Sequence, residues 1–138
     1  MKKRIIITAL SILLASSTVM PAYAAGSSFD LEYANVTQDW ADQYRDAILA
    51  IEGETDRYDF IFKTVTDDFT IKGKGLQWVS VEDFQEGRIS CSQYTECIKL
   101  LCDIAGIECH KVSGWNGSGD DTINHIWNLV KINNEYYY

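Results

Sequence analysis

A helix with clear start and end signals is expected from residue 91 to residue 105, and it constrains the rest of the chain most strongly. Ser90 precedes it and Gln93 follows three residues later, which is the spacing of a capping box. Gly106 stands where a left-handed residue ends a helix. At 100° per residue, apolar side chains form one broad stripe: Tyr94, Cys97, Ile98, Leu101, Ile104 and Ala105. The chain is therefore expected to fold around this helix.

Cys91 is then the first residue of the helix. The unpaired N–H groups there and the positive end of the helix dipole favour an anion, so the thiolate form is favoured. Such a thiol can serve as a nucleophile. Alternatively, Cys91 is one of several half-buried cysteines that only pack, and this stretch alone leaves both interpretations open.

Residues 1–24 have the features of a secretory signal peptide. Lys2, Lys3 and Arg4 precede an apolar run, and Ala22-Tyr23-Ala24 fits a small-x-small cleavage site. The apolar run is about 16 residues long, whereas a spanning helix needs about 20. We therefore predict a secreted or cell-surface protein that has no membrane segment after cleavage.

Charge and length limit the function further. Removing the leader takes three of the 12 basic residues and none of the 20 acidic ones, so the mature formal charge is 9 − 20 = −11. Such an acidic protein is not expected to bind nucleic acid. With 138 residues, of which 46% are hydrophobic, one domain is expected. We place a lead-in segment at 25–36 and the domain at 37–138.

Two helices are predicted before the cysteine helix. The first starts after Thr37 and stops at Gly53, and the second is capped by Thr55. Their apolar side chains recur at helical spacing and are expected in the core: Trp40, Tyr44, Ile48 and Ile51, then Tyr58, Ile61, Phe62 and Val65. The looser segment 67–87, with a short helix from Ser80 to Gln85 that Gly87 ends, is expected to form a wall of the substrate cleft.

The end of the chain is predicted to be β-structure. A strand is expected over 107–112, a glycine-rich loop over 113–124, and a hairpin over 125–138. Asn133-Asn134 suits a two-residue turn with positive φ. Paired residues of this hairpin then have numbers that add up to 267.

A nucleophilic cysteine needs a base, and the chain offers two histidines. His110 follows Cys109 in a strand directly continuous with the helix, a position that suits a surface side chain as well as a catalyst. His125 opens a strand just after the glycine-rich loop, where a side chain can face a cleft.

These residues resemble a known family. The run from Cys91 to Gly114, followed by His125-Ile-Trp-Asn-Leu-Val and Glu135-Tyr-Tyr-Tyr, resembles the transglutaminase-like superfamily. Its bacterial members have a cysteine, a tyrosine three residues on, a leucine-rich helix ending in Gly-Ile, a Val-x-Gly strand end, and His-x-Trp-Asn before a hairpin. The resemblance is strong over 91–138 and rests on helical pattern alone over 37–71.

The resemblance implies a papain-like α+β fold, in which the cysteine helix packs on an antiparallel sheet. It implies that Cys91 is the nucleophile and His125 the base, while His110 matches no catalytic position. The activity implied is acyl transfer at a protein or peptide amide through a thioester, giving hydrolysis, deamidation or crosslinking, without a cofactor. The backbone N–H of Cys91 is the expected oxyanion donor, and Trp78 or Gln85 is a candidate for the second.

The sequence departs from the family at its end. The family's third catalytic residue, an aspartate, would lie two residues beyond Tyr138, so the domain is expected to be truncated here. Asp120 and Asp121 are substitute residues for orienting His125. The alternative function is a non-catalytic extracellular binding module that keeps the fold.

The four cysteines also allow other chemistry. Their spacings of six, five and seven residues contain no C-x₂₋₄-C pair, so no metal site is expected. Cysteines five or six residues apart on one helix are separated by about 8–9 Å, too far for a disulfide. This excludes Cys91–Cys97 and Cys97–Cys102. A bridge from Cys97 or Cys102 to Cys109 stays open.

Overall fold

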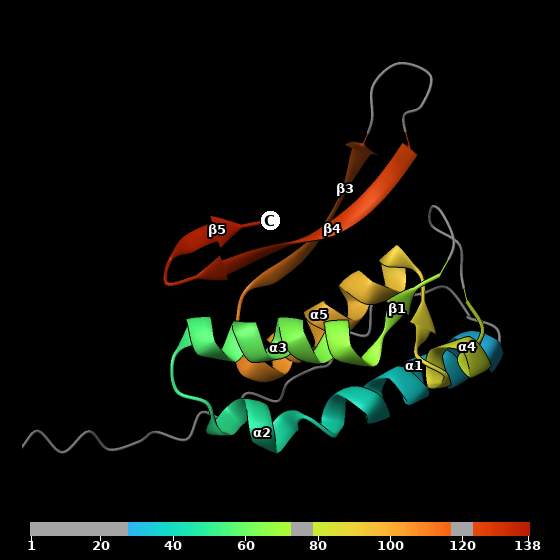
Figure 1. Cartoon of the computed structure of the whole chain (residues 1–138), viewed down its shortest axis with the longest axis horizontal. Coiled ribbons are helices and arrows are strands. Elements are labelled where there is room, and N and C mark those ends of the chain that lie inside the picture. The colour runs from blue at the N-terminus through green and yellow to red at the C-terminus, as the bar shows by residue number, and fades with distance from the viewer. Residues whose placement is uncertain (1–27, 73–78, 117–122) are drawn as a thin grey trace, which may run out of the picture.

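The computed structural model describes residues 28–72, 79–116 and 123–138 (Figure 1). The predicted signal peptide and three candidate site residues, Trp78, Asp120 and Asp121, lie outside these ranges. The protein is of the α+β class, as predicted. Its elements are α1 (Ser28–Asp42), α2 (Arg45–Ala50), α3 (Glu54–Asp68), β1 (Thr70–Ile71), α4 (Val81–Gln85), β2 (Arg88–Ile89), α5 (Cys91–Ala105), β3 (Cys109–Asn116), β4 (Ile123–Ile132) and β5 (Glu135–Tyr137).

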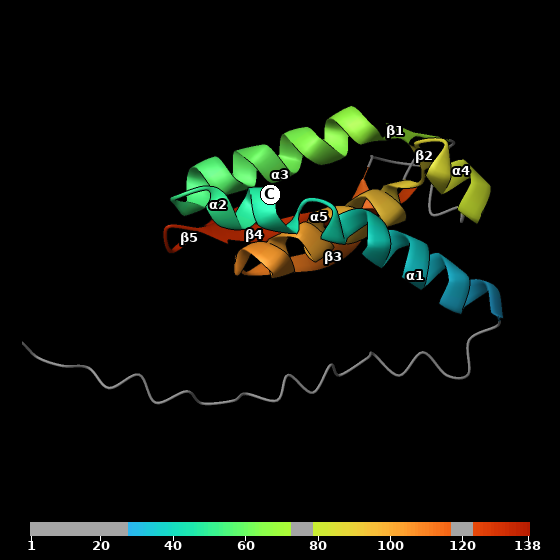
Figure 2. The same ribbon diagram turned by 90° about the horizontal axis from the view of Figure 1, so that it is seen from below.

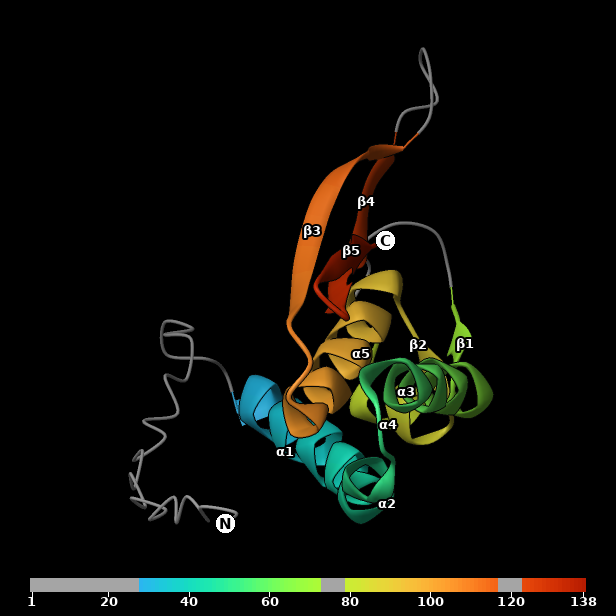
Figure 3. The same cartoon turned by 90° about the vertical axis from the view of Figure 1, so that its left-hand side faces the viewer.

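Helix α5 lies between the sheet β3-β4-β5 and the other helices (Figure 3). Helices α1, α2 and α3 contact it on one side, while β3 and β4 contact it on the other. Cys97, Leu101 and Cys102 are fully buried. Burying a leucine side chain stabilises a fold by about 1.5–3 kcal/mol. The prediction that the chain folds around this helix is confirmed.

The terminal hairpin also follows the prediction. Asn133 and Asn134 have φ angles of 50° and 68°, as a two-residue hairpin turn requires. Val130 pairs with Tyr137, so the predicted register holds. The preceding strands are longer than expected, because β3 continues to Asn116 and β4 begins at Ile123. Their antiparallel ladder satisfies backbone groups over half of the predicted loop, at residues 113–116 and 123–124.

The first helix was predicted wrongly. It begins at Ser28, inside the expected lead-in segment, and ends at Asp42; α2 is a separate helix that begins at Arg45. Tyr33 explains the early start. Its ring is buried and lies edge-on to Phe84, with centroids 5.6 Å apart. A tertiary contact of this kind outweighs a weak local pattern.

Helices α3 and α4 lie close to their predicted positions. Gly53, with φ 85°, directly precedes α3, so Thr55 lies within the helix and does not cap it. Phe62 was expected in the core and is 49% exposed. Ser80 caps α4, because its Oγ accepts a hydrogen bond from the backbone N–H of Asp83 at 3.1 Å.

A short parallel pair, β1 with β2, joins the end of α3 to the start of α5. Figure 2 shows it at the end of the molecule where α5 begins. Thr70 N–H donates to Gly87 O at 2.7 Å. A Cβ on Gly87, whose φ is 74°, would lie 2.7 Å from Asp68 O, so only glycine fits there. This pair was not predicted from the sequence.

Within residues 28–72, 79–116 and 123–138, no helix combines the length and the apolar character that crossing a membrane requires.

Candidate active site at the start of helix α5

The start of α5 is held by the predicted capping box. The backbone N–H of Gln93 donates to Ser90 Oγ at 3.3 Å, and Gln93 Oε1 accepts from the Ser90 N–H at 2.9 Å. Gln93 Nε2 also donates to Val79 O at 3.4 Å. Ser90 and Gln93 are both buried, so these bonds satisfy polar groups that water does not reach. The first helical residue is therefore fixed as Cys91.

Cys91 is 9% exposed and lies at the positive end of the α5 dipole. Within the described part of the chain, which includes all four cysteines, each cysteine is a thiol rather than half of a disulfide. Cys97, one and a half turns further along, is fully buried, and burial raises the pKa of its thiol well above the ordinary range. Cys97 is therefore protonated at neutral pH, whereas Cys91 is the cysteine at the start of α5.

Strand β4 runs in the same direction as α5 (Figure 1). Asn128 Nδ2 donates to Thr95 O at 3.0 Å, which fixes the two elements side by side. From Thr95 back to Cys91 is about 6 Å of helix, and two residues of strand cover a similar length. Counting back along β4 from Asn128, Ile126 is level with Cys91, and His125 lies one residue further toward the start of the strand.

The face of β4 on which His125 lies follows from the alternation of side chains along the strand. Asn128 and the buried Val130 point toward α5, and side chains alternate along a strand whose pairing is unbroken. His125 therefore belongs to the opposite face, together with Trp127. Their rings stack with centroids 6.1 Å apart. The described structure therefore places the His125 ring on the face of β4 opposite the one that contacts α5, the helix that carries Cys91.

Gly114 makes room for this stack. It pairs with His125, and a Cβ at Gly114 would lie 2.9 Å from Trp127 Cη2. The indole therefore lies against the glycine backbone. The Val-x-Gly and His-x-Trp segments of the sequence meet here on one face of the β3-β4 pair.

His110 behaves as a surface residue. Its Nε2 lies 3.0 Å from Glu108 Oε1, and both side chains are exposed. The hydrogen bond from His110, followed by that from Tyr136, holds the pKa of Glu108 down to about 2. His110 therefore contacts Glu108 at the surface of the molecule.

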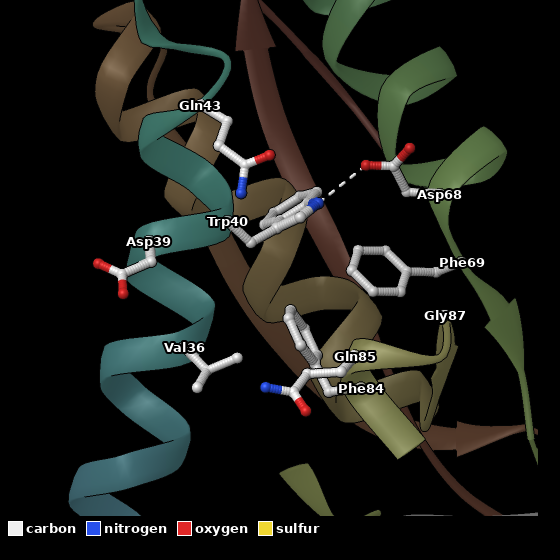
Figure 4. A pocket seen from close by; sticks show the side chains of 9 residues that line it. All are labelled: Val36, Asp39, Trp40, Gln43, Asp68, Phe69, Phe84, Gln85 and Gly87. Atoms are coloured by element: carbon white, nitrogen blue, oxygen red, sulfur yellow. Dashed lines mark hydrogen bonds between the residues drawn. The ribbon is translucent and has the colours of Figure 1, made fainter. Parts of the chain in front are cut away.

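Gln85 lies in a pocket of about 440 Å³ between α1, the end of α3, and α4 (Figure 4). The described residues that line this pocket do not include Cys91. They are Val36, Asp39, Trp40, Gln43, Asp68, Phe69, Phe84, Gln85 and Gly87. The role of Gln85 as an oxyanion donor stays a prediction, and the same holds for Trp78.

Asp68 organises the pocket. Trp40 Nε1 donates to its Oδ2 at 2.8 Å, and Tyr44 Oη donates to the same oxygen. Burial, then the Asp68 carboxylate, raises the pKa of Tyr44 to about 12. Trp40 also packs on Phe69, with centroids 5.0 Å apart. The sequence analysis missed this cluster, although the i, i+4 spacing of two aromatics with polar tips was a signal for it.

Comparison with known proteins shows the fold. The sequence matches no family model and no curated protein. The structure is similar to that of a "putative protease" from Parabacteroides distasonis, with TM-score 0.57 and 10% identity over 80% of this chain and 24% of that chain. It is also similar to a "putative cysteine protease" from Cytophaga hutchinsonii, with TM-score 0.53 and 10% identity over 76% of this chain and 40% of that one.

The chain thus spans less than half the length of either structure. At 10% identity the likeness concerns the fold alone. The α+β arrangement around α5 is therefore one that also occurs in a protein described as a cysteine protease.

Proposed function

We propose that this protein is a secreted thiol enzyme of the transglutaminase-like kind, with a papain-like core, that acts on protein or peptide amides. The observation that carries the proposal is the position of Cys91. It is the first residue of a capped helix at the centre of the domain, where the backbone favours a thiolate. The fold shared with a protein described as a cysteine protease supports it.

The proposed reaction uses Cys91 and His125. His125 takes the thiol proton, and the sulfur attacks the amide carbonyl carbon. The backbone N–H of Cys91 donates to the oxyanion. The protonated His125 then gives its proton to the leaving ammonia or amine, which leaves a thioester on Cys91. Water releases the acid, whereas a lysine amine forms a new amide bond.

The proposed reaction also needs a rotation of the start of β4. His125 shares a face with Trp127, away from α5, so in this proposal the strand end turns toward α5. In the transglutaminase-like family that the sequence resembles, an aspartate orients the imidazole of the catalytic histidine. Losing such a carboxylate lowers the rate by about 10⁴-fold in serine proteases.

Alkylation by iodoacetamide at pH 6 tests the proposal. Cys91 in the native protein should react at least tenfold faster than Cys91 in the urea-unfolded chain, where its reactivity is ordinary. The His125→Ala variant should lose most of this excess, and the matched His110→Ala variant should keep it. If native Cys91 reacts no faster than the unfolded thiol, the activated nucleophile is ruled out.

The second candidate is a non-catalytic extracellular binding module. The stack of His125 on Trp127, on the face away from α5, is the observation that favours it. Ammonia release from a glutamine-containing peptide separates the two functions. An enzyme loses the release in Cys91→Ala, whereas a binding module shows none in the wild type and its binding survives that substitution.

A further inference from the structure

The junction between α5 and β3 brings two cysteines together. Helix α5 ends at Gly106, with φ 71°, and Ile107 N–H donates back to Cys102 O at 2.9 Å. The chain therefore reverses, and β3 packs on the helix from its first residue, Cys109. The thiols of Cys102 and Cys109 form a hydrogen bond, and both residues are buried.

The two thiols are not equivalent. Asn128 Nδ2 donates to Cys109 Sγ at 3.4 Å, and the Cys102 thiol donates to the same sulfur. These two donors lower the pKa of Cys109, and the bond to Cys109 raises that of Cys102. A pair in which one thiol has a lowered pKa and its neighbour a raised one is suited to thiol–disulfide exchange.

We propose that Cys102 and Cys109 are a disulfide-forming pair, oxidised by a disulfide compound such as oxidised glutathione. The Cys109 thiolate attacks one sulfur of the oxidant and releases one glutathione thiolate. Cys102 loses its proton and attacks the mixed disulfide at Cys109, which releases the second. Two protein thiols and one oxidised glutathione thus become one protein disulfide and two reduced glutathione molecules.

The structure selects between the two pairings that the sequence left open. Cys97 lies near Tyr33 of α1, whose pKa burial raises, with the Cys97 thiol as the next cause. It therefore faces the helical layer, whereas Cys109 belongs to the sheet layer. Because the Cys102 and Cys109 thiols are already hydrogen-bonded to each other, they are the pair placed to form a bond of about 2.05 Å. Both sulfurs are buried, so the exchange takes place before α5 and β3 dock, or during local opening.

This pairing is independent of the proposed activity, but it affects which thiols remain. After oxidation the remaining thiols of the chain are Cys91 and Cys97. Cys97 is fully buried and protonated. Cys91 is then the remaining thiol that an external reagent reaches.

The test refolds the full chain from urea with excess oxidised glutathione, followed by iodoacetamide and trypsin. Cleavage after Lys99 and Lys111 places Cys102 and Cys109 in the peptide 100–111, and Cys91 and Cys97 in the peptide 89–99. The 100–111 peptide should be unalkylated and lighter by two hydrogen atoms than its reduced form. Reduction before alkylation should restore two alkylated cysteines.

Matched variants complete the test. Cys97→Ala should still form the bridge, and Cys102→Ala should lose it and leave Cys109 alkylated or glutathionylated. A wild-type 100–111 peptide that carries two alkyl groups or glutathione, or a bridge that includes Cys97, would overturn the proposal. If Cys102→Ala does not fold, the mass of the wild-type peptide decides alone.

Discussion

Helix α5 carries a buried cysteine near each end, and the two cysteines have different surroundings. At the start, Cys91 follows a buried polar pair, Ser90 and Gln93, and the open N–H groups of the helix favour a negative charge. Near the other end, Cys102 lies among apolar side chains and donates to Cys109. In the two proposals above, the same side chain attacks a substrate at one end of the helix and a neighbouring sulfur at the other. Their surroundings differ in that Cys91 lies at a helix start and Cys102 lies against a second thiol.

The largest effect is expected from Cys91→Ala. Ammonia release from a glutamine-containing peptide should fall by about 10³-fold or more, because the covalent route is lost. Cys97→Ala is the matched control on the same helix and should keep the activity. Equal losses in both variants would show that the two ends of α5 do not differ in chemistry.

The next effect is on stability. Leu101→Ala, at a fully buried position between the two layers, should lower the free energy of unfolding by about 2–5 kcal/mol. Leu100→Ala is a control at a half-buried position about 100° around the helix, and it should cost clearly less. Urea unfolding measures both. Similar losses of unfolding free energy in the two variants would contradict the central packing role assigned to Leu101.

The two helix ends are then compared directly. Ser90→Ala removes one side of the capping box and should cost about 1 kcal/mol. Gly106→Ala places a Cβ on a residue with φ 71° and should cost about 1–2 kcal/mol. Only Ser90→Ala should also slow the alkylation of Cys91 at pH 6. A slower reaction in Gly106→Ala would show that general loosening, rather than the helix start, controls the thiol.

The smallest effect is expected for the pH dependence of stability that Glu108 causes, just after the C-terminal end of α5. The folded pKa of Glu108 is about 2, below the usual value for a glutamate, so its stabilisation is present above about pH 4.5 and is lost as pH falls toward 2. The stability difference between the wild type and Glu108→Gln should therefore shrink over this window. Thermal unfolding from pH 6 to pH 2 measures it. A difference that does not change with pH would exclude the ion pair as its cause.

Local signals account for what the sequence predicted correctly. The Ser90-x-x-Gln93 spacing and Gly106 set the ends of α5, and Asn133-Asn134 sets the hairpin register. Each of these depends on residues within a few positions of one another. The start of α1 was missed because Tyr33 is buried against Phe84, which is distant in sequence.

In the candidate site, too, local features could be predicted from the sequence and tertiary contacts could not. The position of Cys91 could be predicted because the helix start is local. The face of β4 that carries His125 depends on how β4 packs against α5. The bond from Asn128 to Thr95 shows this packing, and the sequence does not. Likewise, Asp68 meets Trp40 and Tyr44 through tertiary packing. Helical spacing placed the two aromatics in the core and gave no partner for their polar tips.

The parallel pair of β1 with β2 has a consequence for how the helix start opens. Thr70 N–H donates to Gly87 O, and Lys72 N–H donates to Ile89 O, each at 2.7 Å. Amide protons exchange with solvent only when such bonds open. The exchange rates of the Thr70 and Lys72 amides therefore report how often the segment that leads into Cys91 detaches from β1, the strand that follows α3. These two rates measure the mobility of the segment before Cys91 without any label on its thiol.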